Sequence, residues 1–298
     1  MYDILIIGAG PAGISAGIYA VSRGKKALIL EKAAVGGLIG NVSTVTHYTA
    51  LEPNETGASF AARMKQQALD AGVEIAYETV THVELRGEVK TIHTNKGIHQ
   101  ARRVILANGG TPRQLGIPGE KELAGKGMGM NAARDGAQYM GKNLYVVGGA
   151  DGAVKEALYL ACLARKVTIL HFEDHLGCIA EFRQKVAAAK NISLRLNSRL
   201  QRVWGKNCVE KLEILNVLDQ STDRIEDPGC GIFVYAGISP NTEQYTELEM
   251  QDGYILTNEK METSVPGVYA VGDIRAKQVR QVATAVAEGA IAAINACL

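Results

Sequence analysis

The chain has 298 residues, long enough for two domains of ordinary size, and its hydrophobic fraction of 47% is enough to fill their cores. Lysine and arginine number 32 against 31 aspartates and glutamates, so no excess of positive charge favours nucleic acid or an anionic membrane as a partner. No basic and apolar leader precedes the first strand, and no apolar run approaches the ~18 residues of a membrane span, so we expect a soluble cytoplasmic protein.

The first 31 residues are typical of a dinucleotide-binding βαβ unit. An apolar strand, residues 4–7, runs into three glycines in a G-x-G-x-x-G spacing, Gly8, Gly10 and Gly13. The first glycine allows a tight turn, the second lets a pyrophosphate approach the backbone, and the third lets the helix pack on the strand. The helix N-terminus offers amide donors to the phosphates. A second apolar strand, residues 27–30, ends at Glu31, whose carboxylate is placed to accept both hydroxyls of an adenosine ribose.

The next segments extend this first domain. Residues 32–37 form a loop that contains Gly36 and Gly37, and the polar stretch that continues to about residue 55 is typical of a loop lying along a ligand. Apolar residues spaced four apart predict a helix over residues 58–71. Short alternating segments then predict a small antiparallel excursion from the main sheet, over residues 74–77, 80–85, 89–94 and 102–106.

A stretch rich in glycine and proline, residues 107–119, indicates a crossing into a second domain. Beyond it the opening unit returns. A shift of 140 residues aligns the two copies without a gap, pairing Gly8 with Gly148, Gly10 with Ala150, Gly13 with Ala153, Tyr19 with Tyr159 and Glu31 with His171. We therefore expect a second βαβ unit of the dinucleotide-binding type over residues 144–172.

The remaining residues complete the second domain and return to the first. We expect a helix through residues 186–189, strands over 192–196, 209–217 and 231–235, a second crossing at 237–241, a strand over 265–273 and a buried helix over 281–297. The predicted fold class is α/β, with two Rossmann-like, three-layer dinucleotide-binding domains, the first interrupted by insertion of the second. The first domain comprises residues 1–112 and 244–298, and the second comprises residues 113–243.

The five cysteines are odd in number and widely separated, and no Cys-x-x-Cys occurs. This pattern favours buried or incidental thiols in a reducing compartment. A distant pair brought together by the fold stays open as an alternative, with Cys178 and Cys230 as examples. His171, His175 and Cys178 have spacings compatible with metal ligation but lack a fourth ligand, so we predict no metal site.

Taken together, the motifs resemble the low-molecular-weight thioredoxin reductases, a family of FAD-containing pyridine nucleotide-disulfide oxidoreductases. The resemblance covers the whole chain and rests on GAGPAG at 8–13, GG at 36–37, GIPG at 116–119, GISPN at 237–241, GVYAVGD at 267–273 and RQVATA at 280–285. It implies a homodimer and an FAD site in the first domain, the second being pyridine-nucleotide-binding-like.

In that family the residue at Asp273 contacts the ribityl and pyrophosphate portion of FAD, and the helix that begins near Gln281 points amides at the flavin pyrimidine edge. The FAD-binding residues that the resemblance implies are Gly8, Gly10, Pro11, Ala12, Gly13, Glu31, Lys32, Gly36, Gly37, Leu38, Asn41, Ala107, Asn108, Gly109, Gly272, Asp273, Arg280, Gln281 and Val282.

The resemblance fails at the family's redox disulfide. The Cys-Ala-x-Cys-Asp segment of the family corresponds to residues 131–135, Asn-Ala-Ala-Arg-Asp, where both cysteines are absent. Transfer to thioredoxin through a dithiol needs thiolate attack on a disulfide, so that route is closed. By position Arg134 is expected beside the isoalloxazine, where a guanidinium would favour the reduced anion by about 4 kcal/mol. Asp135 takes the place of the family's proton donor. An exposed arginine and a turn-ordering aspartate are the alternatives.

The second nucleotide site also departs from the family. Gly148 and Gly149 are present, but Ala150 puts a methyl group where glycine lets a pyrophosphate approach. The two arginines that bind the 2′-phosphate of NADPH in the family are replaced by Phe172 and Glu173. We therefore expect NADPH to be disfavoured. Two alternatives stay open: NADH, with Glu173 on its adenosine ribose, and no pyridine nucleotide at all.

The leading hypothesis is an FAD-dependent oxidoreductase that takes electrons from NADH or a ferredoxin-like carrier protein and passes them through FAD directly to an acceptor. The second hypothesis is an FAD-binding regulatory or partner protein without turnover. The third is a disulfide reductase that uses cysteines outside a Cys-x-x-Cys motif.

Overall fold

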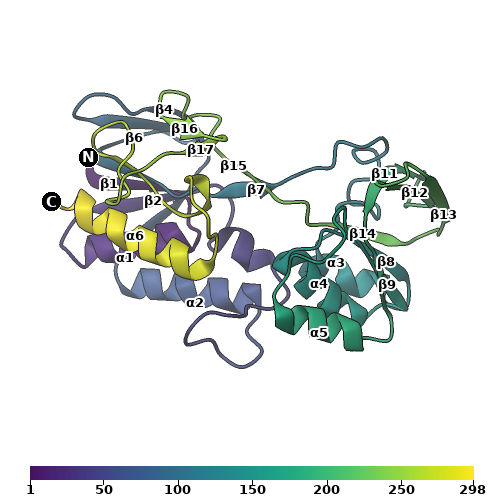
Figure 1. Cartoon of the computed structure of the whole chain (residues 1–298). Helices are drawn as coiled ribbons and strands as arrows, with labels where there is room; N and C mark the ends of the chain where they lie inside the picture. The colour runs from purple at the N-terminus through teal and green to yellow at the C-terminus, as the bar shows by residue number, and fades with distance from the viewer. The chain divides into compact units, whose positions relative to one another are not determined.

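The computed structural model describes residues 1–298, and the chain divides into two compact units (Figure 1). Unit 1 comprises Met1–Thr111 and Ser239–Leu298, and unit 2 comprises Pro112–Ile238. Unit 2 is thus an insertion into unit 1. The chain returns to unit 1 at Ser239 rather than at residue 244, because the amide of Asn241 already donates a hydrogen bond to the carbonyl of Gly109 (3.0 Å).

Unit 1 is built on a seven-stranded sheet with the order β3-β2-β1-β6-β5-β4, in which β18 also pairs with β6. Strands β1, β2, β3, β6 and β18 run parallel, whereas β4 and β5 continue from β6 as an antiparallel meander. The strands are Tyr2–Ile7 (β1), Ala27–Glu31 (β2), Glu74–Tyr77 (β3), Val80–Glu84 (β4), Lys90–Thr94 (β5), Ile98–Leu106 (β6) and Val268–Ala270 (β18).

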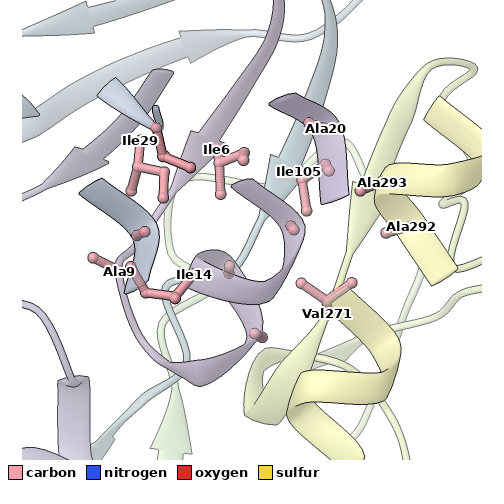
Figure 2. Close-up of a cluster of buried hydrophobic side chains, with 14 of the residues drawn as sticks. Ile6, Ala9, Ile14, Ala20, Ile29, Ile105, Val271, Ala292 and Ala293 are labelled. Atoms are coloured by element: carbon pink, nitrogen blue, oxygen red, sulfur yellow. The ribbon is translucent and has the colours of Figure 1, made fainter. Parts of the chain in front are cut away.

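Three helices cover one face of this sheet: α1 (Pro11–Val21), α2 (Gly57–Asp70) and α6 (Val282–Ala296) (Figure 1). Alternate side chains of β1 point to opposite faces. Ile4 and Ile6 pack against the helices, as Figure 2 shows for Ile6, while Leu5 and Ile7 pack with the β4–β5 meander on the other face. Because both faces of β1 are buried, its sequence is a continuous apolar run.

Small side chains let α6 lie close to α1. Ala292 and Ala293 of α6 pack in the same core cluster as Ala20 of α1 (Figure 2). At Gly289 an added Cβ would overlap the carbonyl oxygen of Ala12, so the two helices meet backbone to backbone there. The last helix of the chain is thus fixed beside the first, and the segment that precedes it lies near the glycine turn.

Several short elements connect these parts. The 3₁₀ helices are Gly37–Asn41 (η1), Gly136–Tyr139 (η2) and Gly272–Ile274 (η3). The two crossings between the units pair as strands, β7 (Gly110–Pro112) with β15 (Ile238–Pro240). A small hairpin in unit 1 joins β16 (Met250–Gln251) and β17 (Tyr254–Ile255).

Unit 2 contains a four-stranded parallel sheet, β10-β9-β8-β14, and a three-stranded antiparallel sheet, β11-β12-β13. One face of the parallel sheet packs under the helices, and the other packs against the antiparallel sheet. The elements are α3 (Ala132–Asp135), β8 (Asn143–Val147), α4 (Asp151–Ala161), β9 (Lys166–Leu170), α5 (Ala180–Ala188), β10 (Ile192–Arg195), β11 (Ser198–Trp204), β12 (Lys211–Asn216), β13 (Thr222–Glu226) and β14 (Gly231–Val234).

The internal repeat predicted from the sequence is present in both sheets. Helix α4 begins and ends 140 residues after α1. The glycine that directly follows the preceding strand has a positive φ in both units, 104° at Gly8 and 134° at Gly148. The chain therefore has the expected α/β fold with two Rossmann-like sheets built on parallel strands, the unit with the second sheet being inserted into the unit with the first. No helix is long and apolar enough to cross a membrane.

Some elements differ from the sequence-based expectations. The strand expected over 209–217 is shorter, because the amide of Val209 bonds to the carbonyl of Lys126 instead of a neighbouring strand. Its partners β11 and β13 were not predicted, since β11 carries an irregularity between Leu200 and Arg202 that breaks the alternating pattern. The strand expected over 265–273 is reduced to β18, because η3 begins at Gly272.

Candidate functional site

The turn between β1 and α1 is a cradle made of backbone groups. Gly8 has a φ of 104°, and a Cβ added there would lie 2.5 Å from the carbonyl oxygen of Ala107, so only glycine fits. A Cβ added at Gly13 would overlap the carbonyl oxygen of Gly8. Gly10 differs from both, since no atom lies within 4 Å of the position of its added Cβ. The backbone at Gly10 is therefore open to close approach by a ligand.

Helix α1 presents its first turn to the same space. The helix begins at Pro11, which has no amide hydrogen to leave unpaired, and no side chain caps its N-terminus. The first amides of an uncapped helix end are free donors and carry the positive end of the helix dipole. Such an end suits a phosphate group.

Segments distant in the sequence converge on this turn. The amide of Gly36 donates to the carbonyl of Ala9 (2.9 Å), which fixes the 32–37 loop beside it. A Cβ added to Gly272 would lie 3.1 Å from the Cβ of Ala12, so η3 also touches the start of α1. The structure thus brings together a set of predicted FAD residues, Gly8, Gly10, Pro11, Ala12, Gly13, Gly36, Gly37 and Gly272.

Glu31 connects the end of β2 to the glycine turn. Its side chain is buried, with Oε2 accepting the amide of Ala9 (2.8 Å) and Oε1 accepting the amide of Ala33 (2.9 Å). Each carboxylate oxygen keeps a further lone pair that can accept a hydroxyl group. Glu31 therefore both holds the turn and offers acceptors beside it.

Lys32, Leu38 and Asn41 lie along the loop that follows Glu31. Lys32 is exposed, and Leu38 and Asn41 belong to η1, where the Asn41 side-chain amide donates to the carbonyl of Gly37 (3.3 Å). These three residues border the glycine turn rather than forming it, and their contact with FAD stays a prediction.

Asn108 connects the chain segments on either side of the insertion. Its Nδ2 donates to the carbonyl of Asn241 (3.1 Å), and its Oδ1 accepts the hydroxyl of Tyr245 (3.1 Å). Asn241 returns a bond from its own Nδ2 to the carbonyl of Asn108 (2.7 Å). The polar atoms of the Asn108 side chain are thus engaged within unit 1, between Ala107, which is buried, and Gly109, which has a φ of 54°. The sequence alone gave no sign of this role.

The Gly272-Asp273 turn and the start of α6 form the other side of the site. Burial raises the pKa of Asp273, and the nearby positive charge of Lys277 opposes that rise. The Arg280 guanidinium lies over the ring of Tyr254, 4.1 Å from its centroid, and its Nε is buried without a hydrogen-bond partner. The amide of Gln281, directly before Val282 and the first turn of α6, donates to Oγ1 of Thr284 (3.2 Å).

These residues fit a bound dinucleotide such as FAD. The open backbone at Gly10, the uncapped start of α1 and the free lone pairs of Glu31 suit a pyrophosphate and a ribose. The buried Nε of Arg280 is an unsatisfied donor, and such donors in native proteins are normally paired with an acceptor.

The equivalent turn in unit 2 has the same backbone but an added methyl group. Ala150 has φ −83° and ψ 174°, close to φ −72° and ψ −178° at Gly10. A Cβ added at Gly148 would lie 2.5 Å from the carbonyl oxygen of Tyr235, which reproduces the relation of Gly8 to Ala107. The Ala150 methyl therefore projects where the corresponding space at Gly10 is open.

Three residues that follow β9, His171 to Glu173, come next to this second turn. His171 is buried, its ring lies against Gly149, and its Nε2 is 3.0 Å from Oε2 of Glu173. Phe172 is exposed, with the guanidinium of Arg199 5.1 Å from its ring centroid. Neither Phe172 nor Glu173 carries a positive charge that could pair with a 2′-phosphate.

Lys155 and Glu156 lie on α4 behind this turn. Burial lowers the pKa of Lys155, while the Glu156 carboxylate, 3.7 Å from Nζ of Lys155, acts against that shift. Lys155 is therefore held inside unit 2 beside a buried acid and is not a free surface charge.

Arg134 and Asp135, neighbours on α3, form an ion pair with each other. Two guanidinium nitrogens of Arg134 each lie 2.7 Å from a carboxylate oxygen of Asp135, and Oδ2 also accepts the amide of Asn131 (2.8 Å). The hydrogen bond from Arg134 lowers the pKa of Asp135, which keeps this carboxyl ionised at neutral pH. The charge of Arg134 is thus balanced by its neighbour, and Asp135 carries no proton to donate.

All five cysteines are free thiols. Cys178 and Cys230 are buried in different hydrophobic clusters of unit 2, and burial raises the pKa of Cys230 to about 12 and also raises that of Cys178. A thiol with a raised pKa supplies little of the thiolate that exchange requires. No group of three or more His, Cys, Asp or Glu side chains is arranged to hold a metal ion.

Comparison with known proteins places this geometry in a family. The profile of the family described as pyridine nucleotide-disulphide oxidoreductase matches residues 2–289, and the chain belongs to that family. Within it the chain is an FAD-dependent oxidoreductase of the thioredoxin reductase type.

Three relatives illustrate the extent of the similarity. The thioredoxin reductase of Peptoclostridium acidaminophilum is 39% identical over 302 residues, covering 99% of this chain and 96% of the relative. The crystal structure of Lactococcus lactis thioredoxin reductase matches with a TM-score of 0.95 and 35% identity, covering 99% and 98% of the two chains. A ferredoxin-flavin thioredoxin reductase from Clostridium acetobutylicum matches with a TM-score of 0.54 and 29% identity, covering 99% and 96%.

Proposed function

We propose that this chain binds FAD in unit 1 and passes electrons from that flavin directly to an acceptor, without a redox disulfide of its own. The observation that carries the proposal is the segment 131–135, where an Arg134–Asp135 ion pair stands at the position of the family's dithiol. Disulfide relay requires two sulfur atoms that exchange by thiolate attack, and this segment contains no sulfur. The burial of Cys178 and Cys230 argues against a substitute pair.

The residues that converge on the glycine turn of unit 1 are our candidates for holding FAD. We assign the open backbone of Gly10 and the first amides of α1 to the pyrophosphate, Glu31 to the adenosine ribose and Asp273 to the ribityl portion. When bound, FAD supplies a group that accepts and releases electrons, and the protein supplies its position and electrostatic environment.

The proposed donor is NADH or a small electron-carrier protein, and NADPH is disfavoured. The Ala150 methyl acts against the pyrophosphate of either nucleotide, whereas the absence of cations at Phe172 and Glu173 acts against a 2′-phosphate in particular. The Clostridium acetobutylicum relative, a ferredoxin-flavin thioredoxin reductase, supports a ferredoxin-like carrier as the second choice of donor.

Anaerobic reduction of the purified flavoprotein tests the proposal. NADH, NADPH and chemically reduced ferredoxin are each mixed with the protein in a stopped-flow cell, and the flavin absorption band is followed. We expect bleaching with NADH or with ferredoxin, and slow or no bleaching with NADPH. Rapid bleaching by NADPH alone would contradict the assignment of Ala150, Phe172 and Glu173.

A second experiment tests the absence of a disulfide relay. The reduced protein is mixed with oxidised thioredoxin, and free thiols are counted before and after. Stoichiometric reduction of thioredoxin that disappears when all five cysteines are replaced by serine would overturn direct transfer from the flavin. The Peptoclostridium acidaminophilum thioredoxin reductase serves as the positive control.

A flavin-binding regulatory or partner protein without turnover is the second candidate. The same two features favour it, namely the absence of sulfur at 131–135 and the altered second turn at Ala150. This candidate predicts bound FAD that neither NADH nor ferredoxin reduces within seconds, whereas the oxidoreductase predicts reduction by at least one of them.

A further inference from the structure

Glu288 is a buried carboxylate on α6 that lies behind the Gly272-Asp273 turn. It is 7% exposed, and its Oε2 accepts the amide of Gly272 at 2.7 Å, while its Oε1 lies 2.8 Å from a guanidinium nitrogen of Arg275. A carboxylate this deeply buried is stable only when it is paired and hydrogen-bonded. Glu288 thus connects the middle of the last helix to the turn that carries Asp273.

Lys277 lies between two carboxylates and bonds more closely to one of them. Its Nζ is 3.1 Å and 3.3 Å from the two oxygens of Glu288, but 3.7 Å from Oδ1 of Asp273. The Lys277 side chain is 7% exposed, whereas that of Asp273 is 28% exposed. Of the two carboxylates, Glu288 therefore takes the closer contacts of the lysine, which also donates to Oγ1 of Thr284 at 3.5 Å, and the Asp273 carboxylate remains accessible.

We propose that Glu288 is a positioning residue for flavin binding, which holds Lys277 away from Asp273 so that the Asp273 carboxylate stays available to accept hydroxyl groups of FAD. The inference rests on the proposed assignment of Asp273 to FAD. Without the negative charge of Glu288, the ammonium of Lys277 has Asp273 as its nearest carboxylate, 3.7 Å away, and closes onto it. The acceptor would then be occupied by an internal ion pair.

The variant Glu288→Gln removes the negative charge, and with it the ion pairs of Glu288 to both Arg275 and Lys277. A glutamine keeps the length of the side chain, and its amide oxygen can still accept the amide of Gly272. The dissociation constant for FAD is measured on deflavinated protein through the fluorescence of FAD itself. We expect an increase of about 10- to 100-fold, the range for losing a hydrogen bond to a charged group.

A second substitution separates positioning from packing. In Glu288→Gln combined with Lys277→Met, no ammonium remains to close onto Asp273, so we expect the FAD affinity to return to within about threefold of the wild-type value. Equal affinities of the single and double variants, with unchanged thermal melting of the apoproteins, would overturn the inference. If E288Q fails to fold, Glu288→Asp, which keeps the charge, is measured instead. Wild-type affinity then supports the inference, and a loss equal to that of D273N overturns it.

Glu262 offers a matched control in the same unit. Its Oε1 accepts the amide of Gly267 at 3.0 Å, the same kind of contact that Glu288 makes with Gly272. The variant Glu262→Gln is expected to bind FAD like the wild type. A loss of affinity in E262Q as large as that in E288Q would show a general effect of removing such a carboxylate and would overturn the inference.

The variant Asp273→Asn distinguishes failure of this inference from failure of the proposed site. If D273N binds FAD as tightly as the wild type, the assignment of Asp273 to FAD is wrong and the inference falls with it. If D273N binds weakly while E288Q binds normally, the site stands and only the role of Glu288 is wrong.

Discussion

The Arg134 guanidinium and the Asp135 carboxylate face each other in a two-pronged ion pair, with Nε 2.7 Å from Oδ1 and Nη2 2.7 Å from Oδ2. The Asn131 side chain completes the turn, because its Oδ1 accepts the amide of Arg134 (2.9 Å). The short helix α3 is thus stabilised by hydrogen bonds made by side chains of its own segment, residues 131–135. An ion pair that is satisfied internally needs no other partner to stabilise it.

The first prediction concerns the acid stability of this ion pair. In Arg134→Met the pKa of Asp135 is expected to rise, because the hydrogen bond from Arg134 is the main cause of its lowering. A carboxyl with a lowered folded pKa stabilises the protein above its unfolded pKa of about 4, and this contribution is lost as the pH falls through the folded value.

The Arg134 side chain is 72% exposed, so solvent screening limits the effect. We expect R134M to lose about 0.5–1 kcal/mol of unfolding free energy at pH 7. Urea unfolding measured from neutral pH to about pH 2 checks this, with Asp135→Asn as the companion variant. A difference between wild type and R134M that persists at the lowest pH would contradict the prediction.

The second prediction compares two glycines of one turn. Gly13→Ala should destabilise the apoprotein by about 1–3 kcal/mol or more, because its Cβ overlaps the carbonyl oxygen of Gly8. Gly10→Ala should stabilise the apoprotein slightly, by about 0.4–1 kcal/mol, since φ −72° suits alanine, no atom lies within 4 Å of the added Cβ and alanine lowers the entropy of the unfolded chain. It should nevertheless weaken FAD binding, measured by fluorescence titration. Normal FAD affinity in G10A would show that no phosphate approaches that backbone.

The third prediction concerns the corresponding position of unit 2. Ala150→Gly removes the methyl at a backbone conformation open to either residue, so we expect a stability loss of only about 0.4–1 kcal/mol from unfolded-chain entropy. If NADH uses this turn, A150G should bleach the flavin at lower NADH concentrations than the wild type, and Ala150→Val at higher ones. Stopped-flow rates across an NADH series check this. Identical concentration dependence in all three proteins would exclude the turn as an NADH site.

The fourth prediction concerns the thiols. Replacing all five cysteines by serine should leave the rate of flavin reduction and reoxidation unchanged, because no thiol takes part in direct transfer. Among the single thiols, Cys162 is exposed and should react first with an aromatic disulfide reagent, whereas Cys230, with a pKa of about 12, should react only on unfolding. Mass spectrometry of time points gives the order of labelling. Early labelling of Cys230 would contradict its buried position.

The fold was predictable from the sequence wherever one local pattern determined it. The run from Ile4 to Ile7 is buried on both faces, and Gly8 and Gly13, which follow it, admit no side chain, so strand, turn and helix are each specified by neighbouring residues. Strand β11 was missed because its irregularity between Leu200 and Arg202 breaks the apolar alternation, and β13 was missed because its residues are mostly exposed and show no alternation.

The site was predictable in its glycines and less so in its buried polar residues. The spacing of residues around Glu288 does not reveal that its side chain bonds to Lys277 and Gly272. Likewise, the spacing around Asn108 does not reveal its bonds to Asn241 and Tyr245. These contacts join residues that are far apart in sequence or on separate elements, so they exist only once the chain is folded. A buried acid on an otherwise small and apolar helix was the one signal available.

The paired crossings of the chain have a consequence for engineering. Strands β7 and β15 lie side by side, and Oγ1 of Thr111 donates to Oδ1 of Asn241 at 2.8 Å. The two cut ends that would remain after deleting the insert are therefore neighbours that a turn of a few residues could join. Unit 2 could therefore be deleted, or replaced by the corresponding unit of a relative, while the chain of unit 1 keeps its path.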